Sequence, residues 1–357
     1  MKGLLLAGGY GTRLRPLTFT GNKHMIPIAN QPMLFYGLRH IADAGIQDVG
    51  IVLGPLHEGI SETVGDGSQF HLRVTYIHQG EPKGLAHAVR CARDFLGGEP
   101  FVMYLGDNLL QGGARPFVER YQQDPVDAIV GVTPVQHPSH YGIVELEGDR
   151  VVSIEEKPVN PRSDLALIGV YLFAPTIHPI IEQLRPSPRG ELEITEAIWK
   201  LYQLGGRLKV QRVEGWWKDT GRPEDLLEAN QKVLRSLEPA PFDVLGTIAP
   251  DATVTGLVRL GANSYVGSGV HIEGPVVIGS HTRIDSRAVI GPDTAIGSNC
   301  EIRGSTILRS IIMDSAEVEG ALELTDSIVG RFARIRAGAN RETRISCVLG
   351  DSTQLRI

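Results

Sequence analysis

The chain has 357 residues, of which 42% are hydrophobic and 21% are charged, and its formal net charge is −6. This length is enough for two domains with a large core, and the mild negative charge argues against non-specific binding to nucleic acid. No apolar run approaches the roughly 20 residues that a membrane span needs. The short apolar start of the chain enters a glycine turn at once, which is not the pattern of a signal peptide.

Three cysteines lie far apart in the sequence, at Cys91, Cys300 and Cys347. This odd, scattered set predicts neither a disulfide framework nor a zinc site. Unpaired thiols are typical of a reducing compartment, so we expect a cytoplasmic protein. From the net charge and the short apolar runs, we expect neither a nucleic-acid partner nor a membrane partner.

The first predicted element is a strand at residues 3–6, which enters a glycine-rich turn in the sequence LLLAGGYGTRLRPL at residues 4–17. Glycines let backbone N–H groups approach anionic oxygens, and Arg13 adds a planar cationic fork. A Walker loop would need Lys and then Ser or Thr after Gly11, and a dinucleotide fingerprint would need glycine where Leu14 stands. The turn therefore predicts a phosphate cradle of a third kind, with a plain glycine turn beside a surface arginine as the simpler alternative.

Strands and helices alternate up to about residue 235. Apolar runs predict strands, apolar on both faces, at residues 49–53, 74–77, 101–105 and 128–132. Helical spacing predicts helices at residues 33–44, 84–95, 114–123, 193–204 and 223–234, and residues 141–154 alternate about Gly148 like a β-hairpin. The fold class predicted is α/β, with a Rossmann-like mixed open sheet whose ligands bind at the carboxyl ends of strands.

The pattern changes after a predicted connector at residues 236–241. Aliphatic residues recur every six positions from Ile248 to Ile302, and several are followed directly by glycine. Such hexapeptide repeats predict a parallel β-helix with the aliphatic side chains stacked inside the coil. The phase slips after Ile302, where we expect loops or irregular coils. We therefore predict a catalytic domain at residues 1–236 and a β-helix domain at residues 242–357.

Eight motifs follow one another along the first domain: AGGYGTRLRPLT at residues 7–18, Lys23 before HMIPIANQPM, QGEPKGLAHA at 79–88, LGDN at 105–108, YGIVE at 141–145, EEKP at 155–158, RGELEIT at 189–195 and WKDTG at 217–221. Together they resemble the sugar-1-phosphate nucleotidylyltransferases, and most closely the long thymidylyltransferases that end in a left-handed β-helix. This resemblance covers essentially the whole chain. It implies transfer of a nucleotidyl group from dTTP to glucose-1-phosphate, giving dTDP-glucose and pyrophosphate, through Mg²⁺-assisted in-line attack on the α-phosphate.

The resemblance also assigns residues to each part of the site. It implies that the nucleotide binds at Ala7, Gly8, Gly9, Gly11, Thr12, Arg13, Gln79 and Gly84. It implies that the sugar phosphate binds at Tyr141, Gly142, Glu156, Lys157 and Arg189, with Glu193 as a weaker member. The implied catalytic residues are Arg13, Lys23, Lys157 and Asp107, and the implied Mg²⁺ ligands are Asp107 and Asp219. Such a set suits the chemistry, because phosphoryl transfer of this kind needs cations and positioning but no covalent intermediate.

Simpler structural interpretations exist for these residues. Asp107 and Asp219 could cap a turn and a helix, Arg13 and Lys23 could be solvated, and Tyr141 could belong to the core. Three residues also depart from the short thymidylyltransferases: His24 stands in place of Gln, Lys83 in place of an acidic residue, and His87 in place of Gln. These departures leave the preference for base and sugar open.

Three other functions compete with the main interpretation. The first is the same reaction with UTP, since no single residue identifies a pocket for the thymine methyl group. The second is an additional acyltransferase in the β-helix, for which His271 and His281 are the histidines available, although we expect both to be exposed coil residues. The third is a non-catalytic binding module. We also expect a homo-oligomer, a trimer by analogy with β-helix proteins or a dimer of dimers by analogy with the short enzymes.

Overall fold

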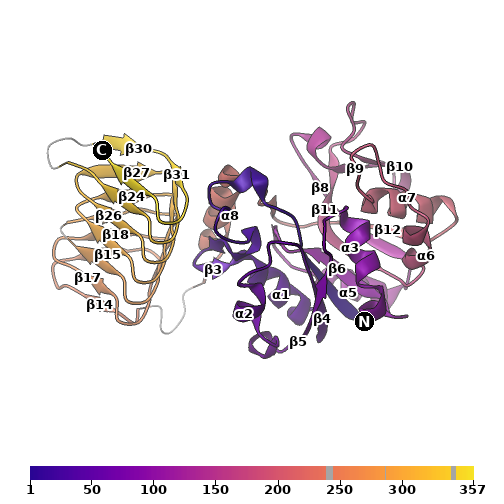
Figure 1. Ribbon diagram of the computed structural model, residues 1–357, viewed down its shortest axis with the longest axis horizontal. Coiled ribbons are helices and arrows are strands. Elements are labelled where there is room, and N and C mark those ends of the chain that lie inside the picture. Colours follow the sequence, from indigo (N-terminus) through magenta and orange to yellow (C-terminus); the bar gives the residue numbers. More distant parts are fainter. Residues whose placement is uncertain (239–243, 286, 339–342) are drawn as a thin grey trace. The chain divides into compact units, whose positions relative to one another are not determined.

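The computed structural model describes residues 1–238, 244–285, 287–338 and 343–357 (Figure 1). Contacts within the chain define two compact units. The first consists of Met1–Tyr10 and Leu34–Asp219, and the second of Gly11–Met33 and Thr220–Ile357. The segment after the first strand therefore belongs to the unit that contains the β-helix. The predicted connector falls partly outside the described residues, and the domain division at residues 236 and 242 stays a prediction.

The first unit is built on a nine-stranded mixed sheet. Four of its strands form the parallel set β6-β1-β4-β5, and β11 continues the sheet in the antiparallel sense beside β6. The strands of this sheet are β1 Lys2–Ala7, β4 Asp48–Leu53, β5 Arg73–His78, β6 Phe101–Leu105, β8 Ala128–Pro134, β9 Gly142–Glu147, β10 Arg150–Glu156, β11 Leu165–Phe173 and β12 Leu208–Arg212. A separate antiparallel pair joins β7 Asn108–Leu110 to β13 Trp217–Asp219.

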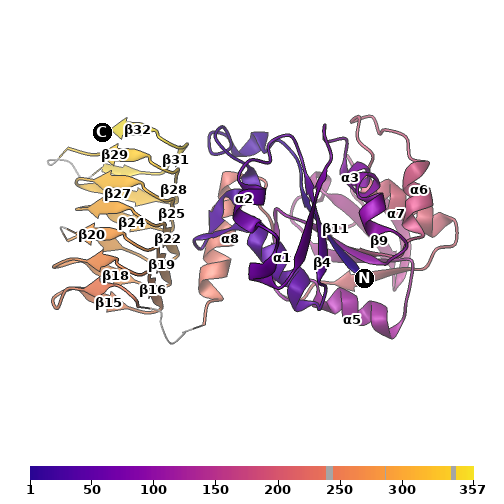
Figure 2. The same cartoon turned by 60° about the horizontal axis from the view of Figure 1, so that its bottom comes forward.

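Helices cover the sheet of the first unit. They are α1 Met33–Asp43, α2 Ile60–Val64, α3 Leu85–Cys91, α4 Arg93–Leu96, α5 Arg115–Gln123, α6 Ile177–Glu182 and α7 Ile194–Gln203, with short 3-10 turns at Ser68–Phe70 and Pro138–His140. Helices α3, α6 and α7 contact one another, and Figures 1 and 2 both show them grouped. Buried residues such as Leu4, Phe101 and Val130 form one core cluster with residues of these helices.

The predicted strands and helices are confirmed with three corrections. The strand predicted at residues 74–77 is not apolar on both faces, because β5 lies at the edge of the sheet and is partly exposed. The helix predicted at residues 84–95 is interrupted at Ala92, whose backbone (φ −88°, ψ 2°) separates α3 from α4. Strand β11 was not predicted, although all nine of its residues are buried.

The second unit contains three parallel sheets of short strands, as in a left-handed β-helix (Figure 2). The first sheet holds β14 Thr247–Ile248, β17 Tyr265–Val266, β20 Arg283–Asp285, β23 Glu301–Arg303, β26 Glu317–Glu319, β29 Arg334–Arg336 and β32 Gln354–Arg356. The second holds β15 Thr253–Thr255, β18 His271–Glu273, β21 Val289–Ile290, β24 Thr306–Leu308, β27 Leu322–Thr325 and β30 Thr343–Ile345. The third holds β16 Val258–Leu260, β19 Val276–Ile278, β22 Thr294–Ile296, β25 Ile311–Ile312, β28 Ile328–Val329 and β31 Val348–Leu349.

The period of six is confirmed as the repeat of the β-helix core. The aliphatic positions from Leu260 to Ile302 are buried and pack in one cluster, with Ile248 and Val254 partly buried against it. Of the loops or irregular coils expected after Ile302, the residues described up to Ile335 form irregular coils. Pairing continues there, from Ile302 to Val318 and on to Ile335. The phase slips because Ile307 and Ile312 each follow the preceding core residue by five positions instead of six.

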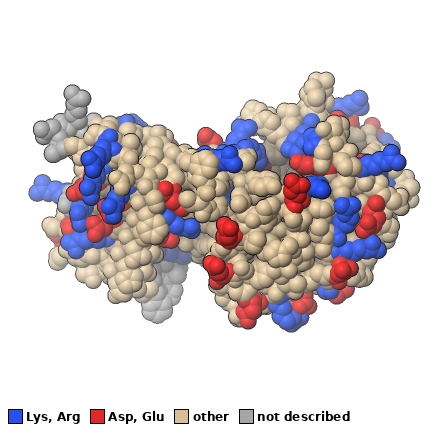
Figure 3. Space-filling view, in the orientation of Figure 1, with Lys and Arg blue, Asp and Glu red and all other residues tan. Residues whose placement is uncertain are grey.

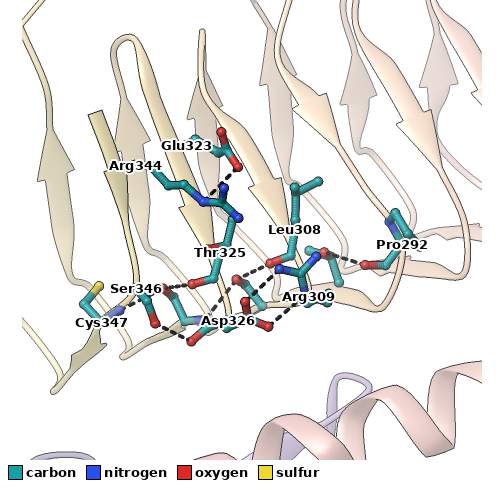
Figure 4. A network of polar contacts seen from close by, with 12 residues as sticks. Pro292, Leu308, Arg309, Glu323, Thr325, Asp326, Arg344, Ser346 and Cys347 are labelled. Carbon is teal, nitrogen blue, oxygen red and sulfur yellow. Dashed lines mark hydrogen bonds and ion pairs between the residues drawn. The ribbon is translucent and has the colours of Figure 1, made fainter. Parts of the chain in front are cut away.

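Polar side chains form hydrogen bonds between successive coils at the corners of the β-helix (Figure 4). Arg309 and Asp326 occupy consecutive coils with positive φ values of 47° and 46°. The Arg309 guanidinium donates to both oxygens of Asp326, at 2.8 and 2.7 Å, and Ser346 donates to the Asp326 carbonyl at 3.1 Å. These bonds link three successive turns of the chain at one corner.

Charges of both signs alternate on the outer face of the first β-helix sheet. Arg283 pairs with Asp285 at 2.6 Å, and Arg334 pairs with Glu317 at 3.1 Å. On the face drawn in Figure 3, Lys and Arg are interspersed with Asp and Glu. Such a surface forms short-range ion pairs and does not create an extended electrostatic potential of one sign.

The second unit also holds short elements from residues 11–33 and one long helix. These are 3-10 turns at Thr12–Leu14 and Lys23–Met25, the hairpin of β2 Pro27–Ile28 and β3 Gln31–Pro32, and α8 Pro223–Arg235. Among the described residues, no helix is long and apolar enough to cross a membrane.

Candidate active site

The turn after β1 lies against a buried glutamine. Strand β1 is buried from Gly3 to Ala7 and ends at Gly8 and Gly9, the latter with φ +98°. A Cβ placed on Gly8 would lie 2.8 Å from Oε1 of Gln79, and one on Gly9 would meet nothing within 4 Å. Gly8 is therefore required by a close approach, whereas Gly9 is favoured by its backbone conformation.

Gln79 is held by groups at the start of α3. Its side-chain nitrogen Nε2 donates to the carbonyl of Gly84 at 3.2 Å and lies 3.1 Å from Nδ1 of His87. Burial is the main reason why the pKa of His87 is lowered, so the imidazole is neutral near pH 7 and can accept this bond. The amide hydrogens of Gln79 are thus used inside the protein, and Oε1 is the atom that can meet a base.

Gly84 cannot be replaced without moving the backbone nearby. Its φ is +96°, and a Cβ there would lie 2.5 Å from the carbonyl oxygen of Leu192. The sequence predicted no role for His87, which differs from the Gln of the short thymidylyltransferases. Its position three residues after Gly84, on a helix that begins at Leu85, is the signal that could have identified it as a partner of Gln79.

The two aspartates predicted as metal ligands lie near β6 and at the end of β13. Asp107 follows that strand, and Asp219 ends β13, where it is paired with Asn108 in the antiparallel ladder. Directly paired residues of such a ladder have Cα atoms about 5 Å apart. The ladder therefore brings Asp219 next to the residue that follows Asp107, although the two aspartates are far apart in sequence.

Asn108 bonds to the carboxylate of Asp107 and is held by two other groups. It is buried, and its Nδ2 donates to Oδ1 of Asp107 at 3.1 Å. Its Oδ1 accepts from the indole nitrogen of Trp217 at 2.7 Å and from the backbone N–H of Gly169 at 3.2 Å. The predicted residues did not include Asn108 or Trp217, though both stand inside the quoted motifs LGDN and WKDTG.

The residues assigned to the sugar phosphate gather around Glu156. Arg189 Nη1 lies 3.2 Å from Glu156 Oε1 and 3.3 Å from Glu193 Oε1, so Arg189 joins the two carboxylates. Burial, followed by the charge of Glu193, raises the pKa of Glu156 above its ordinary value. Lys157 has a φ of +45°, and its N–H donates to the carbonyl of Tyr141 at 3.0 Å. These bonds bring the YGIVE and EEKP motifs together.

Tyr141 and Gly142 lie between the sugar residues and the carboxylate pair. The Tyr141 ring packs edge-on against that of Trp217, with centroids 5.6 Å apart. A Cβ on Gly142 would lie 2.7 Å from Cγ2 of Thr195 and 3.1 Å from Oε2 of Glu156. Trp217 therefore contacts Tyr141 on one side and Asn108 on the other.

The cations of the glycine-rich turn belong to the second unit. Gly11 has φ +60° and precedes the 3-10 turn Thr12–Leu14, where Thr12 and Arg13 are exposed. A Cβ on Gly221, two residues after Asp219, would lie 2.8 Å from Nη2 of Arg13. Lys23 begins the next 3-10 turn and is half-buried. Arg13 thus lies against the glycine of the WKDTG motif.

His24, which stands where the short thymidylyltransferases have Gln, bonds within its own loop. The side chain is buried, and its Nδ1 lies 2.7 Å from Oδ1 of Asn22, which also accepts from the His24 backbone N–H. This imidazole nitrogen is therefore used inside the loop. His271 and His281 in the β-helix are exposed, as expected.

The predicted site residues are divided between the two units. In the first unit, Asp107 precedes Asn108 and Asp219 is the ladder partner of Asn108. The same unit brings together Gly8 with Gln79 and Gly84, and Glu156 with Lys157, Arg189, Tyr141 and Gly142. The second unit holds Gly11, Thr12, Arg13 and Lys23. Each group has the chemistry expected for one part of a nucleotide and sugar phosphate site. Among the described residues, no cluster of three or more His, Cys, Asp or Glu could hold a metal ion.

Comparisons with known proteins agree with this chemistry. Residues 2–236 match the family model described as nucleotidyl transferase, and residues 272–356 match a GMPPB C-terminal domain. The whole chain is 44% identical to 99% of a glucose-1-phosphate thymidylyltransferase from Streptomyces antibioticus and 41% identical to 99% of one from Streptomyces griseus. It is also 42% identical to all of a nucleotidyltransferase for low-salt glycan biosynthesis, Agl11, from Haloferax volcanii.

Solved structures match the first two thirds of the chain. A provisionally named glucose-1-phosphate thymidylyltransferase from Bacillus anthracis, in complex with sucrose, is 34% identical with a TM-score of 0.63, over 67% of this chain and 97% of that one. A UDP-glucose pyrophosphorylase in complex with UDP-glucose is 26% identical with a TM-score of 0.59, over 66% of this chain and 99% of that one.

Proposed function

The chain belongs to the nucleotidyl transferase family, and we propose that it transfers the thymidylyl group of dTTP to glucose-1-phosphate, giving dTDP-glucose and pyrophosphate. The full-length relatives from two Streptomyces species that carry this activity in their names support the choice of nucleotide and sugar. The observation that carries the proposal is the β7–β13 ladder, which pairs Asp219 with Asn108, the residue that follows Asp107. Two carboxylates that reach one metal ion suit a metal-assisted phosphoryl transfer.

The carboxylate pair fits Mg²⁺ as cofactor. This ion binds oxygen ligands and usually keeps several waters, so it is held by one or two carboxylates together with substrate phosphates. Asp107 and Asp219 supply such a pair, and Asn108 fixes one oxygen of Asp107. When bound, the ion would neutralise charge on the α-phosphate. The residues of the chain provide the position, and the substrate provides the remaining ligands.

The proposed reaction is a single in-line displacement. A phosphate oxygen of glucose-1-phosphate attacks the α-phosphorus of dTTP, and the bond from that phosphorus to the bridging oxygen breaks. The electron pair leaves with pyrophosphate, whose growing negative charge needs cations. We assign this role to Arg13, a planar fork, and to Lys23, a point charge. Ala7, Gly8, Gly9, Gly11 and Thr12 would supply backbone groups for the same phosphates.

Sugar phosphate binding is assigned to the residues around Glu156. Lys157 would pair with the phosphate, and Glu156 would accept a bond from a sugar hydroxyl. Arg189 already bridges Glu156 and Glu193, so it orients the carboxylate in the protein without substrate. The edge-on contact between Tyr141 and Trp217 would limit the space for the sugar on the side of the carboxylate pair.

Base recognition is assigned to Gln79 and Gly84. Because the amide hydrogens of Gln79 are used by Gly84 and His87, its Oε1 is left to accept from the N3–H of a pyrimidine. Thymine and uracil both carry that donor, so UTP is the second candidate for the nucleotide. The three unpaired thiols support a cytoplasmic location, and we propose a homo-oligomer by analogy with related β-helix proteins. No described feature favours acyl transfer in the β-helix.

A pyrophosphate-release assay tests the proposal. Purified protein is incubated with glucose-1-phosphate, Mg²⁺ and one of dTTP, UTP, GTP, ATP or CTP. We expect turnover with dTTP to exceed that with UTP, and no turnover with the purine nucleotides. Absence of turnover with both pyrimidine nucleotides dTTP and UTP would refute the proposal. Binding of dTTP, measured by isothermal titration calorimetry, without pyrophosphate release would favour a non-catalytic module instead.

A further inference from the structure

The outer face of the third β-helix sheet is buried at the middle coils, in β22, β25 and β28. Successive residues of a strand point to opposite faces, so Ile296, Ile312 and Val329 point into the coil while their neighbours Ala295, Ile311 and Ile328 point outward. These three outward residues are nevertheless fully buried. Within the same unit, helix α8 contacts both β22 of this sheet and β2 of the loop at residues 11–33. The β-helix therefore has a covered side, and the loop with the proposed phosphate cations is part of the cover.

A buried asparagine joins the loop, the helix and the coil. Asn230 of α8 is fully buried, and its Oδ1 accepts from the N–H of Ala29 at 2.8 Å. Its Nδ2 donates to the carbonyl of Asp293 at 3.1 Å. Next to Ala29, the side chain of Asn30 donates to the carbonyl of Ile296 at 2.5 Å. These bonds fix the end of the loop on the middle coils.

The last coils hold the part of the loop that carries the cations. Thr20 Oγ1 donates to Oδ2 of Asp351 at 2.7 Å. Oδ1 of the same carboxylate accepts from the N–H of Arg331 at 2.7 Å, and the Arg331 guanidinium donates to the carbonyl of Met25 at 3.4 Å. A Cβ on Gly350 would lie 3.1 Å from the carbonyl oxygen of Pro16. The coil ends therefore contact the loop at three points.

These three points lie near both proposed cations in the sequence, and they bracket Lys23. Pro16 and Thr20 lie between Arg13 and Lys23, and Met25 follows Lys23 by two residues. We propose that Asp351 and Arg331 of the β-helix are positioning residues that hold the loop in the conformation that binds the triphosphate. This inference rests on the proposed function, because it takes Arg13 and Lys23 as phosphate ligands. If a loop occupies its binding conformation for only a fraction of the time, its apparent affinity for the ligand is reduced in proportion to that fraction.

Matched variants separate this role from a general loss of stability. Asp351→Ala removes the acceptor of Thr20, whereas Asp351→Asn keeps one oxygen for the Arg331 N–H and an amide group that can donate to the Thr20 hydroxyl. Arg331→Ala removes the bond to Met25. Its control is Arg334→Ala, three residues further along the same coil. This variant also removes an arginine, but one that pairs with Glu317 on the first sheet. The dissociation constant of dTTP is measured by isothermal titration calorimetry, and Tm by thermal unfolding.

We expect Asp351→Ala and Arg331→Ala to weaken dTTP binding about three- to tenfold, which corresponds to the loss of one hydrogen bond. Asp351→Asn should restore most of the affinity, and Arg334→Ala should leave it unchanged even where Tm falls equally. If dTTP binds equally to Asp351→Ala, Arg331→Ala and the wild type, the inference is overturned. It is also overturned if affinity falls in step with Tm in all four variants. A wild type that gives no pyrophosphate release marks failure of the proposed function itself, which is a different result.

Discussion

The buried asparagine beside the carboxylate pair gives the sharpest prediction about stability. In Asn108→Ala, the N–H groups of Gly169 and Trp217 lose their common acceptor, and Asp107 loses a donor. The Gly169 N–H is buried, so leaving it unpaired costs about 1–3 kcal/mol, and the lost bond to the carboxylate adds about 1 kcal/mol. We expect the free energy of unfolding to fall by about 2–4 kcal/mol.

Trp217→Phe is the matched variant. It removes the indole donor but leaves Asn108 bonded to Gly169 and Asp107, so no buried donor is left without an acceptor. We expect a loss of about 1 kcal/mol, in line with one net hydrogen bond. Urea unfolding of both single variants and of the double variant measures the coupling, and the double variant should lose less than the sum of the two. A larger loss in Trp217→Phe than in Asn108→Ala would refute this reasoning.

The variants Asn108→Ala and Trp217→Phe can also be compared by their affinity for a metal ion. If Asn108 orients Asp107, its removal should weaken Mn²⁺ binding, followed by electron paramagnetic resonance, by about tenfold or more. Trp217→Phe should change that affinity less. Unchanged Mn²⁺ binding in Asn108→Ala would mean that the asparagine stabilises the fold and does not position the metal ligand.

Three further predictions concern other parts of the chain. Burial lowers the pKa of His40 from 6.5 to about 4, where its Nδ1 lies 2.9 Å from the Tyr104 hydroxyl. Because the unfolded chain then binds a proton that the folded state does not, stability should fall by up to about 3 kcal/mol as pH drops from about 6.5 to 4, and urea titrations of His40→Asn should lack this fall. Arg235→Ala leaves the carboxylate of Asp293, 3% exposed, without its bidentate partner. We expect a loss of about 2 kcal/mol in urea unfolding, against less than about 1 kcal/mol for the more exposed pair in Arg283→Ala, and equal losses would contradict the argument. Burial raises the pKa of Cys300 to about 12, so its thiol should react with an aromatic disulfide reagent only after denaturation, and fast reaction in the folded protein would contradict its burial.

Much of the fold follows from local patterns in the sequence. The period of six predicts the β-helix because each aliphatic residue stacks on its equivalent one coil later, as Ile284 does on Ile302. The parallel strands are predicted because they are short apolar runs between helices. The phase slip after Ile302 left loops and irregular coils both open, since a corner that is one residue shorter breaks the sequence period without breaking the ladder.

The parts that could not be predicted depend on contacts between distant residues. Nothing local indicates that β13 pairs with β7, which is what brings Asp219 beside Asn108. The burial of His24 and the bond from His87 to Gln79 likewise follow from the folded loops. The sequence motifs predict which residue types form the site. The geometry of those residues depends on the β7–β13 ladder and on the buried amides of Asn108 and Gln79.

The most direct test of the account follows the phosphates of the nucleotide. Protein is incubated with glucose-1-phosphate and dTTP labelled with ³²P at either the α- or the γ-position, and the products are separated by chromatography. We predict that the α-label enters the sugar nucleotide and the γ-label leaves in pyrophosphate, and that Asp107→Asn and Asp219→Asn each slow both by orders of magnitude. Entry of the γ-label into a sugar product, or full activity in both aspartate variants, would contradict it.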